Sequence, residues 1–168
     1  IVSCFLQDIE PFNADLKNLE TLKLYTNQFR RFKTGLFVDL INLKELILSF
    51  SFRIENQTSK NNCIKPKKQK TNHNDILTYK FFDGLANLET LDLSSNGIEY
   101  IEPFAFQNLK NLTKLNLFDN NLYQLNHNLL FGLNKLEEIN LDNNKQIMFD
   151  DKSFEFIMIF VVNRSYWK

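Results

Sequence analysis

Residues 91–98 read LDLSSNGI, and the asparagine of this stretch, Asn96, follows two leucines that alternate with polar residues. The same order returns in LKLYTNQF at 22–29, in LNLFDNNL at 115–122 and in INLDNNKQ at 139–146. An asparagine beside leucines is either a functional group or part of a scaffold. Because the pattern recurs, self-similarity along the chain has to be established before any motif is interpreted.

Five copies of the pattern lie in register. Measured between their first leucines, the intervals are 24, 45, 24 and 24 residues. Those leucines are Leu19, Leu43, Leu88, Leu112 and Leu136. Apolar residues follow each of them by three and five positions, and a bulky apolar residue, mostly phenylalanine, lies six positions before the next start. The interval of 45 therefore holds one period and an insertion of 21 residues.

The spacing of the leucines predicts the local structure. Side chains alternate along a strand, so the leucines of each LxL segment point into a core and the residues between them point outward. Successive strands should pair in parallel, while the remaining residues return on the opposite side as turns or short helices. Each repeat buries its apolar face only against its neighbours, so several repeats must stack to be stable.

The resulting unit, LxxLxLxxNxIxxIxxxxFxxL, resembles the leucine-rich repeat family. Its length is most similar to the extracellular type found in Toll-like and Slit-like receptors and secreted proteins. The resemblance covers residues 12–160, apart from about 52–76. It implies an α/β leucine-rich-repeat solenoid that is curved, with parallel β-strands on the concave face and loops or short helices on the convex face. We expect residues 1–168 to form a single domain of this kind.

The recurring asparagine falls where the chain leaves the strand and turns. Backbone groups there have no sheet partner, and an amide side chain can both donate to and accept from them. We therefore interpret this column as a structural ladder. Its members are Asn27, Asn96, Asn120 and Asn144, and Ser51 occupies the same position in the second repeat.

The insertion at about 52–76 is polar and locally basic, with six lysines and arginines against two acidic residues between positions 53 and 75. Such a composition cannot bury enough apolar surface to repay its ordering entropy, so we expect a loop on the convex or lateral side. Two interpretations stay open: a contact for an anionic partner, or a solvated insertion that is an evolved loop or a gene-model artefact.

Catalytic and metal-binding patterns are missing from the sequence. Cys4 and Cys63 fit no zinc spacing, and whether they pair is left open. His73 and His127 lie near no nucleophile motif, and the oxygen-rich run at 142–144 is better explained as a strand end with its ladder asparagine than as a calcium site. We expect no enzyme activity, no cofactor and no metal.

Charge and targeting features bear on partners and location. Twenty basic and 20 acidic residues balance, so no nucleic-acid partner is expected. The longest apolar run, at 156–162, is too short to span a membrane. Sequons at Asn56, Asn111 and Asn163 are candidate glycosylation sites and favour a secreted protein or ectodomain. Cysteine-rich caps are missing, so we expect a fragment of a longer protein, membrane-anchored or secreted, with exposed core at its ends.

The outward positions of the strands line one shared face, which is where a solenoid binds proteins. The candidate contacts on this concave face are apolar or aromatic anchors and charged neighbours: Tyr25, Ile47, Phe50 and Phe118, with Lys23, Asp92 and Asp119. These features predict a non-catalytic recognition module for a protein ligand or co-receptor, in innate immunity or cell-surface signalling. The alternative is a structural spacer with no ligand of its own.

Overall fold

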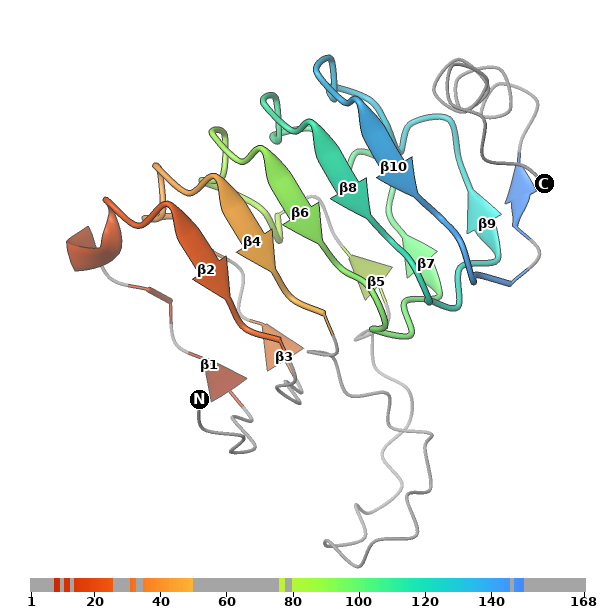
Figure 1. Ribbon diagram of the computed structural model, residues 1–168, viewed down its shortest axis with the longest axis horizontal. Coiled ribbons are helices and arrows are strands. Elements are labelled where there is room, and N and C mark those ends of the chain that lie inside the picture. Colours follow the sequence, from red (N-terminus) through yellow and green to blue (C-terminus); the bar gives the residue numbers. More distant parts are fainter. Residues whose placement is uncertain are drawn as a thin grey trace, which may run out of the picture.

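The chain folds as a solenoid of stacked coils with two rows of strands (Figure 1). The structure, a computed structural model, describes residues 8–9, 11–12, 14–25, 31–32, 35–49, 76–77, 80–145 and 147–149. Asn27, Phe50, Asn56 and Asn163 of the predicted site residues lie outside these ranges, as do Cys4, Cys63 and nearly all of the insertion.

The first row is a five-stranded parallel sheet with the order β10-β8-β6-β4-β2. Its strands are three residues long and each contains the middle leucine or isoleucine of a repeat. They are β2 (Thr21–Lys23), β4 (Glu45–Ile47), β6 (Thr90–Asp92), β8 (Lys114–Asn116) and β10 (Glu138–Asn140). Their alternating burial agrees with the predicted period of two, because in β8 the leucine is buried and its neighbours point outward.

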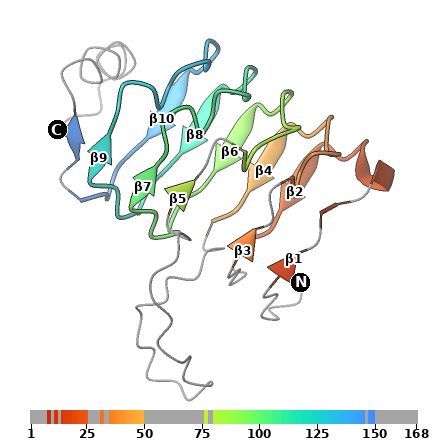
Figure 2. The same cartoon turned by 180° about the vertical axis from the view of Figure 1, so that it is seen from behind.

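The second row lies on the opposite side of the core, as the view from behind shows (Figure 2). Its strands have two residues each and pair in parallel as β1 with β3, β5 with β7 and β9 with β11. They are β1 (Asp8–Ile9), β3 (Arg31–Phe32), β5 (Ile76–Leu77), β7 (Tyr100–Ile101), β9 (Gln124–Leu125) and β11 (Met148–Phe149). Among the described residues the only helical element is a 3-10 turn at Ala14–Leu16, so short strands and turns form the predicted convex side.

The strand register follows the sequence period. Leu22 pairs with Leu46, and Leu91 pairs with Leu115 in the same column. Leu46 pairs directly with Leu91, although they are separated by the long interval. The sheet therefore continues across the insertion as if it were not there.

The core lies between the two rows of strands. It is filled by the leucines of the repeats together with buried phenylalanine rings. Phe82 lies 5.6 Å from Phe106 between ring centroids, and both rings are fully buried. Burial decreases at the described ends of the solenoid, where Leu22 and Ile139 are only partly buried.

Successive coils approach so closely at Gly84 and at Gly132 that a Cβ would clash with the backbone of the preceding coil. Gly84 has φ +91°, and a Cβ at this position would lie 2.5 Å from the carbonyl oxygen of Val38 in the preceding coil. Gly35 has a similar φ of +79°, but a Cβ there would meet nothing within 4 Å. The two glycines share the left-handed conformation and differ only in how close the neighbouring backbone is.

We predict that Gly84→Ala destabilises the fold more than Gly35→Ala. Both changes carry the left-handed penalty of roughly 1–2 kcal/mol, whereas only the first forces two backbones apart, at roughly 1–3 kcal/mol more. Urea unfolding followed by circular dichroism measures the difference. Equal losses for the two variants would show that the coils are not held at the separation seen here.

Candidate functional site

Asn120 shows what the recurring asparagine does. Its Nδ2 donates to the carbonyl of Leu93 in the preceding coil at 3.0 Å and to that of Leu117 in its own turn at 3.0 Å. Its Oδ1 accepts from the N–H groups of Asn96 at 3.1 Å and Ile98 at 3.0 Å. Only 4% of the Asn120 surface is exposed. With a longer bond of 3.3 Å to the Phe118 carbonyl, a single amide therefore contacts five backbone groups and ties two coils together.

The neighbouring members of the column repeat this geometry. Asn96 Nδ2 donates to the carbonyl of Leu48 at 2.9 Å, and Asn144 Nδ2 donates to that of Leu117 at 2.9 Å. Asn144 Oδ1 also accepts from Leu122 N–H at 3.1 Å. These bonds leave the amides engaged with backbone and buried or half-buried, so the column supports the turns and presents no free group to a substrate.

A second polar row follows the ends of the strands. Asp92 Oδ1 accepts from the backbone N–H of Ser94 at 2.8 Å, and Asn116 Oδ1 accepts from that of Phe118 at 3.1 Å. Asn116 Nδ2 donates to Asp92 Oδ1 at 3.1 Å, which links the two turns. An Asx side chain that caps the N–H two residues on is a common way to fix a turn. The sequence reasoning assigned Asp92 to a partner and missed this local role.

A third polar row lies next to the ladder, at residues with left-handed backbone. Ser95, Asp119 and Asn143 have φ of 55°, 54° and 57°. Ser95 Oγ donates to Asp119 Oδ2 at 2.9 Å, and Asn143 Nδ2 donates to Asp119 Oδ1. Aspartate and asparagine tolerate this conformation better than most residues. Asp119 is thus held in place by both neighbouring coils while its charge stays at the surface.

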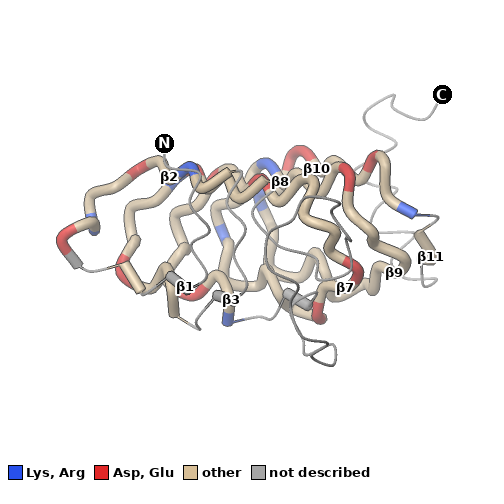
Figure 3. The backbone as a smooth tube through the Cα atoms, turned by 90° about the horizontal axis from the view of Figure 1, so that it is seen from below, with Lys and Arg blue, Asp and Glu red and all other residues tan. Residues whose placement is uncertain are grey.

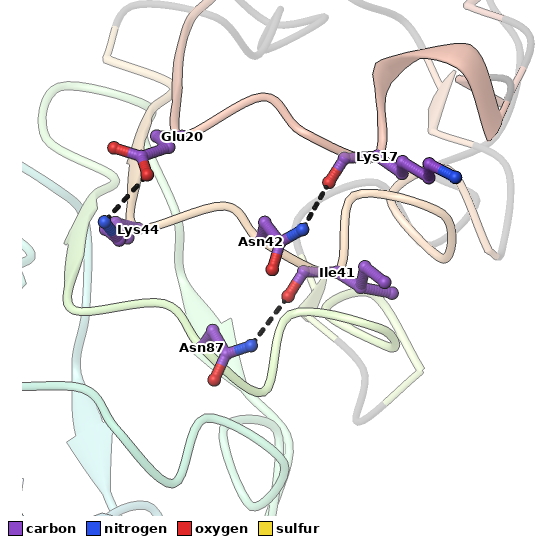
Figure 4. A network of polar contacts seen from close by, with 6 residues as sticks. All are labelled: Lys17, Glu20, Ile41, Asn42, Lys44 and Asn87. Carbon is purple, nitrogen blue, oxygen red and sulfur yellow. Dashed lines mark hydrogen bonds and ion pairs between the residues drawn. The ribbon is translucent and has the colours of Figure 1, made fainter.

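A fourth polar row runs along the opposite ends of the strands (Figure 4). Asn42 Nδ2 donates to the carbonyl of Lys17 at 2.9 Å, and Asn87 Nδ2 donates to that of Ile41 at 2.8 Å. Asn111 continues the row through a 3.0 Å bond to the carbonyl of Ala86. These residues line a polar groove of ≈ 500 Å³ whose other walls include Glu20, Lys44 and Glu89. The nitrogen of Asn111 that a glycan would modify is therefore a structural donor.

Lys44 is the central cation of this groove. Its Nζ lies 2.8 Å from Glu20 Oε1 (Figure 4). The hydrogen bond and the charge of Glu20 raise the pKa of Lys44 above its usual value, with a smaller contribution from Glu89. The lysine stays protonated, and its charge is shared between carboxylates of two coils.

The predicted contact residues that the structure describes lie on the outer face of the five-stranded sheet, which we call the open sheet face. It is formed by the outward side chains of β2, β4, β6, β8 and β10 and of the residues next to these strands. Tyr25 and Phe118 are 43% and 39% exposed. Ile47 is half-buried, and Lys23 lies 3.4 Å from Glu45 across the strand pair.

Exposed apolar side chains also occur away from this face, and the sequence reasoning did not single them out. Phe104 and Phe131 form an edge-to-face pair with centroids 5.3 Å apart, and Phe104 has φ +64°. Ile41 and Tyr123 are 50% and 43% exposed. The sequence gives no sign that these side chains are exposed. They lie among apolar repeat positions that are mostly buried, so an apolar residue there would be expected to be buried as well.

The described part of the chain holds no group of three or more metal-ligating side chains. His127 is exposed, on a turn between β9 and the next strand, β10. Within the same described ranges, no helix has the length and apolarity that a membrane crossing needs. The open sheet face carries carboxylates, amides, a few lysines and exposed aromatic rings, which are groups that can contact a partner.

Parallel strands in a 24-residue register, a buried asparagine column and an open sheet face define a leucine-rich repeat solenoid. A family model described as "Leucine rich repeat" matches residues 72–122 and 86–146. The two matches together show that residues 72–146 carry leucine-rich repeats. Comparison with curated protein sequences finds no match.

One solved structure shares the fold, and a second aligns less closely. The crystal structure of a TLR13–ssRNA13 complex has a TM-score of 0.57 and 24% identity, with coverage of 89% of this chain and 22% of that chain. The structure of the Toll–Spatzle complex of Drosophila has a TM-score of 0.48 and 19% identity, with coverage of 88% and 24%. This chain therefore spans about a fifth to a quarter of the chains it matches.

We predict that Asn120→Ala lowers the free energy of unfolding by about 2–4 kcal/mol, since it removes the acceptor of the Asn96 and Ile98 N–H groups and one of the donors to two buried carbonyls. Asn42→Ala is the matched control, because its amide makes one bond at an exposed site; it should cost less than about 1 kcal/mol. Thermal and urea unfolding of both variants check the difference. A loss at Asn120 no larger than that at Asn42 would contradict the structural role of the buried column.

Proposed function

We propose that this chain is a non-catalytic module that recognises a protein ligand or co-receptor through the open sheet face. The observation that carries the proposal is the exposure of two aromatic side chains, Tyr25 and Phe118, on a sheet whose other face is a closed core. Exposed aromatic rings on a rigid surface are the usual anchors of protein interfaces. The face also repeats its outward side chains at every coil, which provides an extended contact surface.

Rigidity supports the same conclusion. The backbone under Phe118 is held from both sides, because its N–H donates to Asn116 and its carbonyl accepts from Ser95 N–H at 2.9 Å. A side chain on a fixed backbone loses little conformational freedom when a partner covers it. Little of the binding energy is then spent on ordering the site.

The family and fold suggest where such a module works. The matching structures are of a TLR13 complex with ssRNA13 and a Toll complex with Spatzle. We infer a role in innate immunity or cell-surface signalling, in an extracellular or cell-surface location, with glycosylation at Asn56, Asn111 or Asn163. We do not extend the RNA of the TLR13 complex to this chain, because carboxylates outnumber lysines on its open sheet face.

A structural spacer is the second candidate, and one observation favours it. Lys23 and Asp119 are already bonded within the chain, to Glu45 and to Ser95. Side chains that satisfy one another need no partner. The two candidates differ in what happens when the aromatic residues are removed.

We predict that the triple variant Tyr25→Ser, Ile47→Ser, Phe118→Ser folds and loses its partner. The binding loss should be at least about tenfold, because a lost interface anchor costs on the order of 1–2 kcal/mol. Pull-down from the extracellular fluid or membranes of the source organism, followed by titration of the recovered partner, measures it. The matched control is Tyr123→Ser, Ile41→Ser, Phe131→Ser, which removes the same types of exposed side chain elsewhere.

Partner recovery that survives the first variant would reject the open sheet face as the binding surface. A chain that recovers no partner at all, in wild-type or variant form, would favour the spacer. Circular dichroism and thermal unfolding of both triple variants show that each is folded before binding is compared.

A further inference from the structure

Charge is unevenly distributed over the open sheet face. The whole chain is electrically neutral, with 20 basic and 20 acidic residues. On this face the coils of β2 and β4 carry two carboxylates and two lysines, whereas the coils of β6, β8 and β10 carry six carboxylates and one lysine. The six are Glu89, Asp92, Asp119, Glu137, Glu138 and Asp142. Acidic positions are also prominent around β10 in the view along the sheet (Figure 3).

The end of the face near β2 and β4 is neutralised by its own residues. Lys44 lies 2.8 Å from Glu20, and Lys23 lies 3.4 Å from Glu45. These two ion pairs bridge neighbouring coils, and Glu89 of the β6 coil adds a weaker attraction to Lys44, so the charges of this part of the face are largely balanced. An incoming charge of either sign would gain little there.

The end near β8 and β10 is not neutralised in this way. Its one lysine, Lys114, lies 3.7 Å from Glu138. Glu137 and Asp142 are exposed on the same coil as Glu138. Asp92 and Asp119 accept hydrogen bonds from neutral groups, which fix their positions without forming an ion pair.

An aromatic ring stands among these carboxylates. Phe118 is 39% exposed and lies in the same outward column as Ser94 and Asp142, directly before Asp119 in the chain. The face of a phenylalanine ring attracts a cation, and guanidinium groups use it most often. A ring beside uncompensated carboxylates selects for an arginine-bearing surface more sharply than either feature alone.

From this arrangement we infer that the β6–β10 part of the open sheet face docks a cationic, arginine-rich segment of the protein partner, with Phe118 beneath an arginine side chain. The inference rests on the proposed function and adds the chemistry of the partner to it. The carboxylates attract the segment and set its register, and the ring gives a contact that persists when salt screens the charges.

The test uses the full chain and two synthetic peptides, one arginine-rich and one in which glutamate replaces every arginine. Wild-type protein should bind the first and not the second, with affinity falling as salt rises. Glu89→Gln, Glu137→Gln, Asp142→Asn removes three exposed charges without changing side-chain size. We expect this variant to bind about tenfold more weakly, equivalent to about 1.4 kcal/mol.

Two further variants sharpen the result. The control Asp39→Asn, Glu99→Gln, Glu102→Gln removes the same charge away from the open sheet face and should leave binding within about twofold of wild type. Phe118→Leu keeps an apolar side chain but loses the ring, and should weaken binding about two- to fivefold, also at high salt. Equal losses for the two charge variants, or binding of both peptides alike, would overturn the inference.

Failure of this inference is distinguishable from failure of the proposed function. Suppose that a natural partner no longer binds the Tyr25, Ile47 and Phe118 variant but still binds the three-carboxylate variant. This outcome would support the recognition module and reject a cationic partner. Should the three-carboxylate variant not fold, Glu137→Gln alone carries the same comparison with a smaller change.

Discussion

The solenoid depends on the hydrogen bonds that one amide side chain makes to the backbone of two coils. A turn that leaves a three-residue strand exposes N–H and C=O groups to a core that offers no water. Asn120 supplies both missing donors and missing acceptors to Leu93, Leu117, Asn96 and Ile98. Without that side chain, the leucines could still bury their side chains, but the N–H groups of Asn96 and Ile98 would lose this acceptor and the stacked turns would be less stable.

Polar side chains at the surface also join neighbouring coils by hydrogen bonds. Side-chain hydrogen bonds join each turn to the turn of the next coil, so neighbouring coils fix the turn that follows each strand. They link Asn116 to Asp92, Ser95 to Asp119 and Asn143 to Asp119. Scaffold and binding face are therefore made of adjacent residues rather than separate regions. A substitution at Asp119 would change both the turn geometry and the charge that a partner meets, whereas one at Glu137 would change the charge alone.

The repeat register was predictable from the sequence because spacing encodes it directly. The pairing of Leu46 with Leu91 follows from subtracting the insertion, and parallel pairing follows from a coil that always returns in the same direction. The roles of Asp92 and Asp119 were not predictable in this way. A polar side chain at an outward strand position can either cap the following turn or contact a partner. The hydrogen bond from Ser94 N–H to Asp92 Oδ1 shows that Asp92 caps the turn.

Exposure was equally hard to infer. The position of Phe104 in its coil corresponds to that of Gly35, which also has positive φ, and nothing in the letters of the repeat indicates that a ring there would be exposed and paired with Phe131. Leu130, by contrast, occupies the column of Phe82 and Phe106 and is buried like them. The position of a residue in the repeat therefore predicts its burial only where successive coils have the same backbone conformation.

The direct pairing of β4 with β6 has a consequence for how the chain can vary. Because β4 pairs with β6 without a change of register, the pairing of the two coils does not depend on how many residues separate them in the sequence. Loop-closure entropy rises slowly with length, by only about 0.6 kcal/mol for each doubling. This junction can therefore gain, lose or exchange sequence at small cost, which makes it the natural place to graft a second module without disturbing the first.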